Sequence, residues 1–203
     1  NSSYIRGIAD FRGKLIVGFA EGAIIGNTGI YSDDGANHLP EFNDNVEQHG
    51  TISHRCMLSY GDDMLLLDLI GISSLKRTVF TGTLRPERIS DLINKEIIPS
   101  TTPLSFTTLE DRVFSIYDQR NNAFLFFIPN GDTPETTTET RGYQYAYRPN
   151  LNVAAWSTIS GWNWSCAIRS LQGQIFLGDR DGNLYLYGNQ ELPLYKDFID
   201  NID

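Results

Sequence analysis

Short apolar runs, separated by turns rich in glycine, aspartate and asparagine, recur along this 203-residue chain. The clearest copy is residues 171–188, where the runs 175–178 and 184–187 flank Asp181 and Gly182. Asp-Gly between two β-rich runs predicts a β-hairpin with a two-residue type I′ turn, since both central residues of that turn need a positive φ.

The same unit occurs four times. The second turn of each copy lies at Gly22, Gly71, Asn122 or Gly182, about 49, 51 and 60 residues apart. A further strand is expected before each hairpin, at residues 4–9, 54–59, 104–108 and 165–169. Three or four short strands repeated every ~40–50 residues are typical of β-propeller blades.

We therefore predict an all-β protein, a β-propeller-like repeat of antiparallel blades that is part of a larger ring, with one short helix. A small closed propeller and an ordinary β-sandwich with regularly spaced hairpins are the alternatives. The expected blades are residues 4–53, 54–103, 104–164 and 165–203 of one propeller over 1–203. Continuous runs such as LLL and FLFF indicate inner strands that are buried on both faces. The chain starts without Met, so we expect a fragment of a longer protein.

Three segments interrupt the repeat. Residues 27–49 are polar and predict a long surface loop. Residues 85–97 carry apolar side chains at helical spacing after Pro86, which predicts a short amphipathic helix with the proline in its first turn. Residues 130–140, NGDTPETTTET, predict a flexible insertion.

Composition limits the class of protein. The chain is 40% apolar and 12% aromatic, with a net charge of −9, which favours a globular protein and argues against one that grips nucleic-acid phosphates. A conduit along which DNA slides remains open, since repulsion would prevent sticking. Cys56 and Cys166 provide neither a disulfide framework nor metal spacing, and suit a reducing compartment. No apolar run is long enough to span a membrane.

Motifs for chemistry fail on spacing. The sequence DRDGN at 179–183 has Leu184 where a calcium loop needs Gly and Gln190 where it needs Glu, so a β-turn is favoured. Residues 32–35, SDDG, miss the spacing of a sialidase Asp-box. His38, His49 and His54 have no Cys or carboxylate to complete a zinc set, and no GxSxG elbow orients a nucleophile. We predict no catalytic residue, no cofactor and no metal.

An aromatic-rich band is the remaining candidate site. Its tryptophans are Trp156, Trp162 and Trp164, and its tyrosines Tyr143, Tyr145 and Tyr147 have the two-residue period of a strand face. Aromatic side chains of this kind fill the core between sheets or stack on sugars or bases. We favour packing and keep the three tryptophans as a candidate partner contact.

Residues 49–77, HGTISHRCMLSYGDDMLLLDLIGISSLKR, resemble the tail nozzle and hub proteins (tail tubular B-like, DNA-stabilisation) of short-tailed bacteriophages. The recurrent phrase of that family, a Gly-Thr/Cys-Val-Ser step, two strands and a Gly-Ile-x-Ser-Leu strand, is similar to residues 50–53, 56–60, 63–68 and 71–75, in that order. Similar phrases occur at 88–93, at 143–145 with 155–157, and at 182–188.

The resemblance implies a structural virion component of the tail, assembled in the host cytoplasm, and not an enzyme. Such a protein forms a homo-oligomeric ring around the DNA ejection conduit, passes DNA without sequence-specific binding, and docks adaptor, fibre or needle proteins. The alternative is a glycan- or receptor-binding propeller module of a phage or bacterial surface protein.

Overall fold

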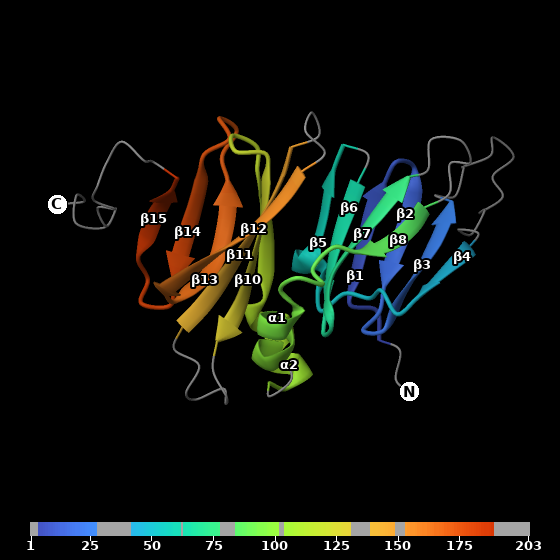
Figure 1. Ribbon diagram of the computed structural model, residues 1–203, viewed down its shortest axis with the longest axis horizontal. Helices are drawn as coiled ribbons and strands as arrows, with labels where there is room; N and C mark the ends of the chain where they lie inside the picture. The colour runs from blue at the N-terminus through green and yellow to red at the C-terminus, as the bar shows by residue number, and fades with distance from the viewer. Residues whose placement is uncertain are drawn as a thin grey trace, which may run out of the picture. The chain divides into compact units, whose positions relative to one another are not determined.

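The computed structural model describes residues 4–27, 42–61, 63–77, 84–101, 104–130, 139–148 and 153–188 (Figure 1). The chain divides into two compact units, Asn1–Ile98 and Pro99–Asp203, each with its own core. The described residues form four antiparallel sheets and few helices, so the prediction of an all-β protein is confirmed. The arrangement of the sheets as blades of a propeller remains a prediction.

The first unit contains two four-stranded sheets, and within each sheet every strand pairs with its neighbours in the chain. The first sheet comprises β1 (Gly7–Phe11), β2 (Lys14–Gly18), β3 (Gly22–Asn27) and β4 (Phe42–Glu47). The second, after a 3-10 helix at His54–Cys56, comprises β5 (Met57–Tyr60), β6 (Asp63–Asp68), β7 (Gly71–Arg77) and β8 (Leu84–Arg88). One core joins the two sheets, with Phe11, Ile16, Ala23, Ile25 and Val46 from the first and Met64, Leu66 and Leu75 from the second.

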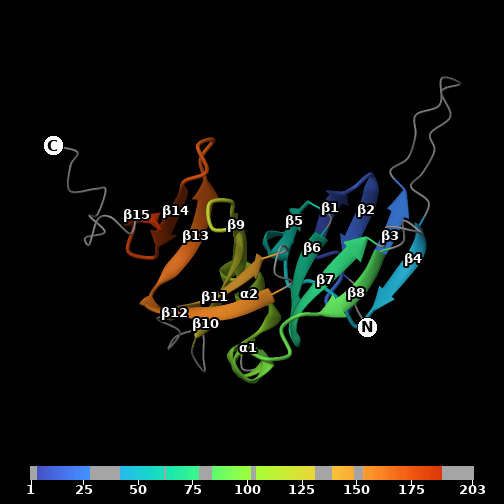
Figure 2. The ribbon, with the colours of Figure 1, turned by 45° about the horizontal axis from the view of Figure 1, so that its top comes forward.

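The second unit follows α1 (Asn94–Thr101), which spans the boundary between the units, and contains α2 (Phe106–Arg112). Its four-stranded sheet has the order β12-β11-β10-β9 (Figure 2), with β9 (Phe114–Asp118), β10 (Ala123–Asn130), β11 (Glu139–Arg148) and β12 (Val153–Trp162). A three-stranded sheet comprises β13 (Trp164–Arg169), β14 (Ile175–Asp179) and β15 (Leu184–Tyr187). The core between these sheets contains Phe114, Leu125, Phe127, Trp164, Ile175 and Leu177.

The continuous apolar runs are buried on both faces, as predicted. Leu65, Leu66 and Leu67 of β6 are all fully buried although consecutive side chains of a strand point to opposite faces. The run FLFF of β10, residues 124–127, is buried in the same way. Both faces of these inner strands are therefore apolar packing surfaces.

The predicted helix over 85–97 is wrong in its first half. Leu84–Arg88 is strand β8, in which Pro86 lies opposite Leu75 at the outer edge of the second sheet. An edge strand tolerates proline because one of its sides needs no backbone donor. The helix begins only at Asn94 and runs to Thr101.

The predicted strand at 104–108 is also wrong, because helix α2 occupies Phe106–Arg112. The Ser105 hydroxyl accepts a hydrogen bond from the backbone N–H of Thr108 at 3.2 Å, which is the N-cap contact that starts a helix. The hairpin with its turn at Asn122 therefore joins the first and second strands of the third sheet. The turns at Gly22 and Gly71 join second and third strands, so the third copy is offset by one strand.

The predicted surface loop at 27–49 contains the fourth strand of the first sheet, since Phe42–Glu47 pairs with β3. Residues 28–41, which include His38 and the SDDG motif, lie outside the described residues, as do residues 131–138 of the predicted insertion.

The hairpin over 171–188 is confirmed by the antiparallel pairing of β14 with β15. Its turn is not type I′, because Gly182 has a positive φ of 91° while Asp181 does not. Four residues separate the strands, and the side chain of Asp179 closes this longer loop by accepting the backbone N–H groups of Asp181 and Asn183. None of the described helices is long and apolar enough to cross a membrane.

Candidate functional site

An aromatic row crosses one face of the sheet β9–β12. Tyr117, Phe124, Tyr145 and Trp156 occupy directly opposite positions on β9, β10, β11 and β12. Their neighbouring ring centroids lie 5.0, 6.3 and 4.8 Å apart. Opposed aromatic pairs stabilise a sheet, and the row ends at Trp156 on the edge strand.

The three candidate tryptophans lie in different environments. Trp164 is buried in the core of the second unit, where its ring meets that of Tyr185 edge-on at 5.1 Å. Trp156 is half-buried. Trp162 ends β12 opposite Thr140, and its side chain is outside the described part of the structure. A partner contact by this set remains a prediction, and Trp156 is the better placed of the two described rings.

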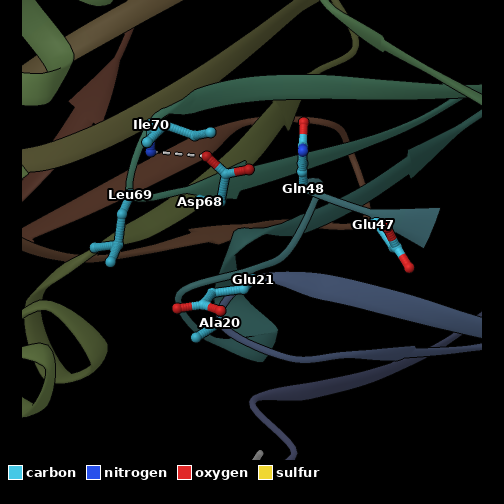
Figure 3. Close-up of a pocket in the computed structure, with 7 residues that line it drawn as sticks. All are labelled: Ala20, Glu21, Glu47, Gln48, Asp68, Leu69 and Ile70. Atoms are coloured by element: carbon cyan, nitrogen blue, oxygen red, sulfur yellow. Dashed lines mark hydrogen bonds between the residues drawn. The ribbon is translucent and has the colours of Figure 1, made fainter. Parts of the chain in front are cut away.

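A cavity of about 500 Å³ in the first unit is a second candidate site, which the sequence did not indicate (Figure 3). Its walls come from the β2–β3 turn, the end of β4 and the β6–β7 turn, and they carry three carboxylates. The lining residues are Ala20, Glu21, Glu47, Gln48, Asp68, Leu69 and Ile70. Glu21 and Glu47 are exposed, whereas Asp68 is buried.

Asp68 is held by contacts from three parts of the unit. Its Oδ1 lies 2.8 Å from Nη1 of Arg88, at the end of β8, and 2.9 Å from the backbone N–H of Ile70, which donates to it (Figure 3 shows the second contact). The backbone N–H of Gly50 also donates to this carboxylate. Burial raises the pKa of Asp68, and Arg88 opposes that shift. The carboxylate is therefore engaged within the protein.

Arg88 extends this cluster to the loop after β4. Its Nη2 donates to the carbonyl of Gln48 at 2.9 Å, and Gln48 adopts a positive φ of 65°. Beside it, Nδ1 of His49 lies 2.7 Å from the hydroxyl of Ser73. Burial and the positive charge of Arg88 lower the pKa of His49. Ser73 is fully buried, so this Ser–His pair cannot present a nucleophile to a substrate.

The DRDGN segment forms a turn in which both carboxylate oxygens of Asp179 are occupied. Besides two backbone N–H groups, Asp179 accepts hydrogen bonds from the Asn183 amide and the Tyr185 hydroxyl, both at 2.9 Å. Burial would raise the pKa of Asp179, but the hydrogen bonds from Asn183 and Tyr185 outweigh it and the pKa is lowered. Among the described residues, no three His, Cys, Asp or Glu side chains are grouped so as to hold a metal ion.

The same turn device occurs at three aspartates of the described part of the chain. Asp68, Asp118 and Asp179 each end a strand and each accept the backbone N–H of the residue two positions on, at 2.9, 3.0 and 2.9 Å. An Asp that ends one strand of a predicted hairpin is a sequence signal for this turn. At Asp68 the signal could have located the β6–β7 turn, which forms one wall of the cavity.

Comparison of the chain with protein-family models and with curated proteins finds no match. Function is therefore inferred from the residues themselves.

Proposed function

We propose that the chain is a structural assembly module, whose four sheets are blades of a β-propeller in the tail nozzle or hub of a short-tailed bacteriophage. The likeness of residues 49–77 to such tail proteins points to the tail, and successive antiparallel sheets of neighbouring strands are the construction of propeller blades. In this proposal the chain contributes to the DNA ejection conduit, docks other tail proteins and performs no catalysis.

The observation that supports the proposal best is the apolar character of the outer sheet faces. In each unit two sheets pack through one face, and the opposite faces of the first and last sheets each carry an apolar row. Ile8, on the outer face of the first sheet, is 59% exposed, and Ile168, on the outer face of the last, is 66% exposed. Each lies in an apolar row, Ile8–Val17–Ile24 in the first sheet and Ile168–Phe176–Leu186 in the last. Exposed apolar side chains such as Ile8 and Ile168, each beside further apolar residues of its row, mark contact surfaces, as expected where further sheets stack.

The charge of the chain is compatible with a conduit. The net charge of −9 disfavours phosphate binding, so DNA would pass without adhering. The ring would be held by apolar sheet faces and loops, while the acidic surface faces water or DNA.

Imaging and mass measurement test the proposal. The chain, alone and mixed with the other tail proteins of the same phage, is examined by negative-stain microscopy and mass photometry. We expect ring-shaped assemblies that contain the chain. The variant Ile168→Asp should reduce assembly, whereas Leu92→Asp, at a side chain 87% exposed and outside the sheets, should not. A chain that joins no tail assembly would count against the proposal.

A glycan-binding module is the second candidate, favoured by the half-buried ring of Trp156 at the end of the aromatic row. A glycan array tests it directly. Binding that is lost in Trp156→Ala, while the circular dichroism spectrum is unchanged, would support this function. The absence of binding to any glycan would reject it.

A further inference from the structure

Strand β12 is the longest edge strand of the four described sheets, and the two other edges without charge or proline, β5 and β15, have only four residues each. It lies at the edge of its sheet (Figure 2), runs for 10 residues, VAAWSTISGW, and contains no charged residue and no proline. The edge strand β8 has five residues, LRPER, with proline and three charges, and β4 has six, FNDNVE, with two acidic residues. Proteins usually protect edge strands by such charges, prolines or short length.

One end of β12 is protected and the rest is regular. Between the pairs Gly142–Ile159 and Thr140–Trp162 the register shifts, which places an extra residue at Ser160–Gly161, and Gly161 has a positive φ of 91°. Residues 153–159 pair without interruption with residues 148–142 of β11. The regular segment therefore has Trp156 at its centre.

The side chains around Trp156 are small. Ala154, Ala155, Ser157 and Thr158 are all exposed. These uncharged side chains leave the edge without the charges that protect other edges, so a further strand can pair with it at the usual spacing of about 4.8 Å. With a net charge of −9 per chain, two copies repel each other overall, and an uncharged strand is where they can meet without opposing like charges.

We propose that β12 is a homodimer contact, at which a second copy of this chain adds its own β12 in antiparallel orientation about a two-fold axis at Trp156. In that register Ala154 lies opposite the partner's Thr158, Ala155 opposite the partner's Ser157, and Trp156 opposite the partner's Trp156. The aromatic row of one sheet then continues into the row of the other. Main-chain pairing between edge strands supplies the affinity. This contact does not depend on a role in a phage tail.

Two double variants of the full chain test both the contact and its register. Ala154→Lys/Thr158→Lys places lysine opposite lysine on both sides of the axis, whereas Ala154→Glu/Thr158→Lys places opposite charges together only in the antiparallel, Trp156-centred register. Sedimentation velocity over a concentration series measures the dissociation constant, and circular dichroism confirms that each variant is folded.

We expect a wild-type dimer, a dissociation constant raised roughly tenfold or more in the Lys/Lys variant, and a dimer retained in the Glu/Lys variant. A wild-type chain that is monomeric at its highest soluble concentration would overturn the proposal, as would a Lys/Lys variant that dimerises like wild type. If the Glu/Lys variant dissociates as readily as the Lys/Lys variant, the antiparallel register is wrong. If a variant is unfolded, Ser157→Lys, also on the exposed edge, replaces it with the same expectation of dissociation.

Discussion

Replacing Arg88 by Met should destabilise the first unit strongly. Arg88 forms the ion pair with Asp68 at 2.8 Å, and the Asp68 side chain is only 3% exposed. Methionine keeps much of the apolar stem and removes the guanidinium. The substitution therefore leaves a buried carboxylate without its counter-charge, and such a charge cannot recover its hydration unless the structure opens.

The expected loss is about 3 kcal/mol in the free energy of unfolding. Removing one partner of a buried ion pair costs about 3–5 kcal/mol. The lower end applies here because Asp68 keeps hydrogen bonds from the backbone N–H groups of Ile70 and Gly50. Arg88 also donates to the carbonyl of Gln48, near the surface, and losing that bond adds little because water can replace the donor.

The loss should depend on pH. Burial already raises the pKa of Asp68 in the native protein, and Arg88 opposes the shift, so the pKa rises further in Arg88→Met. A carboxyl whose pKa is higher in the folded state stabilises the fold below its unfolded pKa, and that contribution disappears as the pH rises through the folded value. The variant should thus approach wild-type stability on acidification, because Asp68 then binds a proton.

Urea unfolding of wild type and Arg88→Met at about pH 7.5 and about pH 5 measures both effects. The matched control is Arg88→Met/Asp68→Asn, which removes both charges and should show a smaller loss with no such pH dependence. A loss below about 1 kcal/mol at neutral pH, or an equal loss at both pH values, would show that Asp68 does not depend on Arg88 as described.

Three shorter predictions concern other sites. In Gly71→Ala the new Cβ would lie 2.5 Å from Oδ1 of Asn94, at a φ of 143°, so urea unfolding should show the free energy of unfolding lowered by more than about 2 kcal/mol. The control Gly61→Ala, where the φ is 55° and no atom lies within 4 Å of the new Cβ, should lower it by about 1 kcal/mol. Equal losses in the two variants would contradict this. Burial raises the pKa of Cys56 to about 11, while Cys166 is exposed. A thiol reagent at neutral pH should therefore modify one cysteine of the native chain, and both after unfolding. Rapid modification of both cysteines in the native chain would refute the burial of Cys56. Ser105→Ala removes the N-cap of α2 and should cost about 1 kcal/mol by urea unfolding, and an unchanged midpoint would show that the cap is dispensable.

Local signals in the sequence were sufficient for the hairpins. The pairs β2–β3, β6–β7, β9–β10 and β14–β15 each combine two apolar runs with a turn between them, and all four are antiparallel neighbours in the structure. Residues of one hairpin are close in sequence, so turn chemistry and strand propensity act together. The place of each hairpin within its sheet depends on distant segments and could not be predicted in this way.

The error at residues 85–97 arises where tertiary contacts override a local pattern. Apolar residues at helical spacing after Pro86 resembled a helix, but residues 84–88 complete the edge of the second sheet, and the Ile89 N–H still pairs with the carbonyl of Ile72 at 3.0 Å. At Ser105 the reverse happened, because a threonine-rich stretch that suits a strand is capped into a helix.

The acidic residues illustrate the same division between local and distant information. Asp68, Asp118 and Asp179 share one local role, since each accepts a backbone N–H within its own turn. Only Asp68 of these three is also shown paired with an arginine, which lies 20 residues further along the chain, and no spacing rule in the sequence announces that contact. The three carboxylates are therefore engaged in turns, whereas acidic groups such as Glu21 and Glu47 are exposed. Substitution of those two glutamates should alter association with charged partners and leave the fold intact. Substitution of the turn aspartates should instead destabilise the fold and leave that association unchanged.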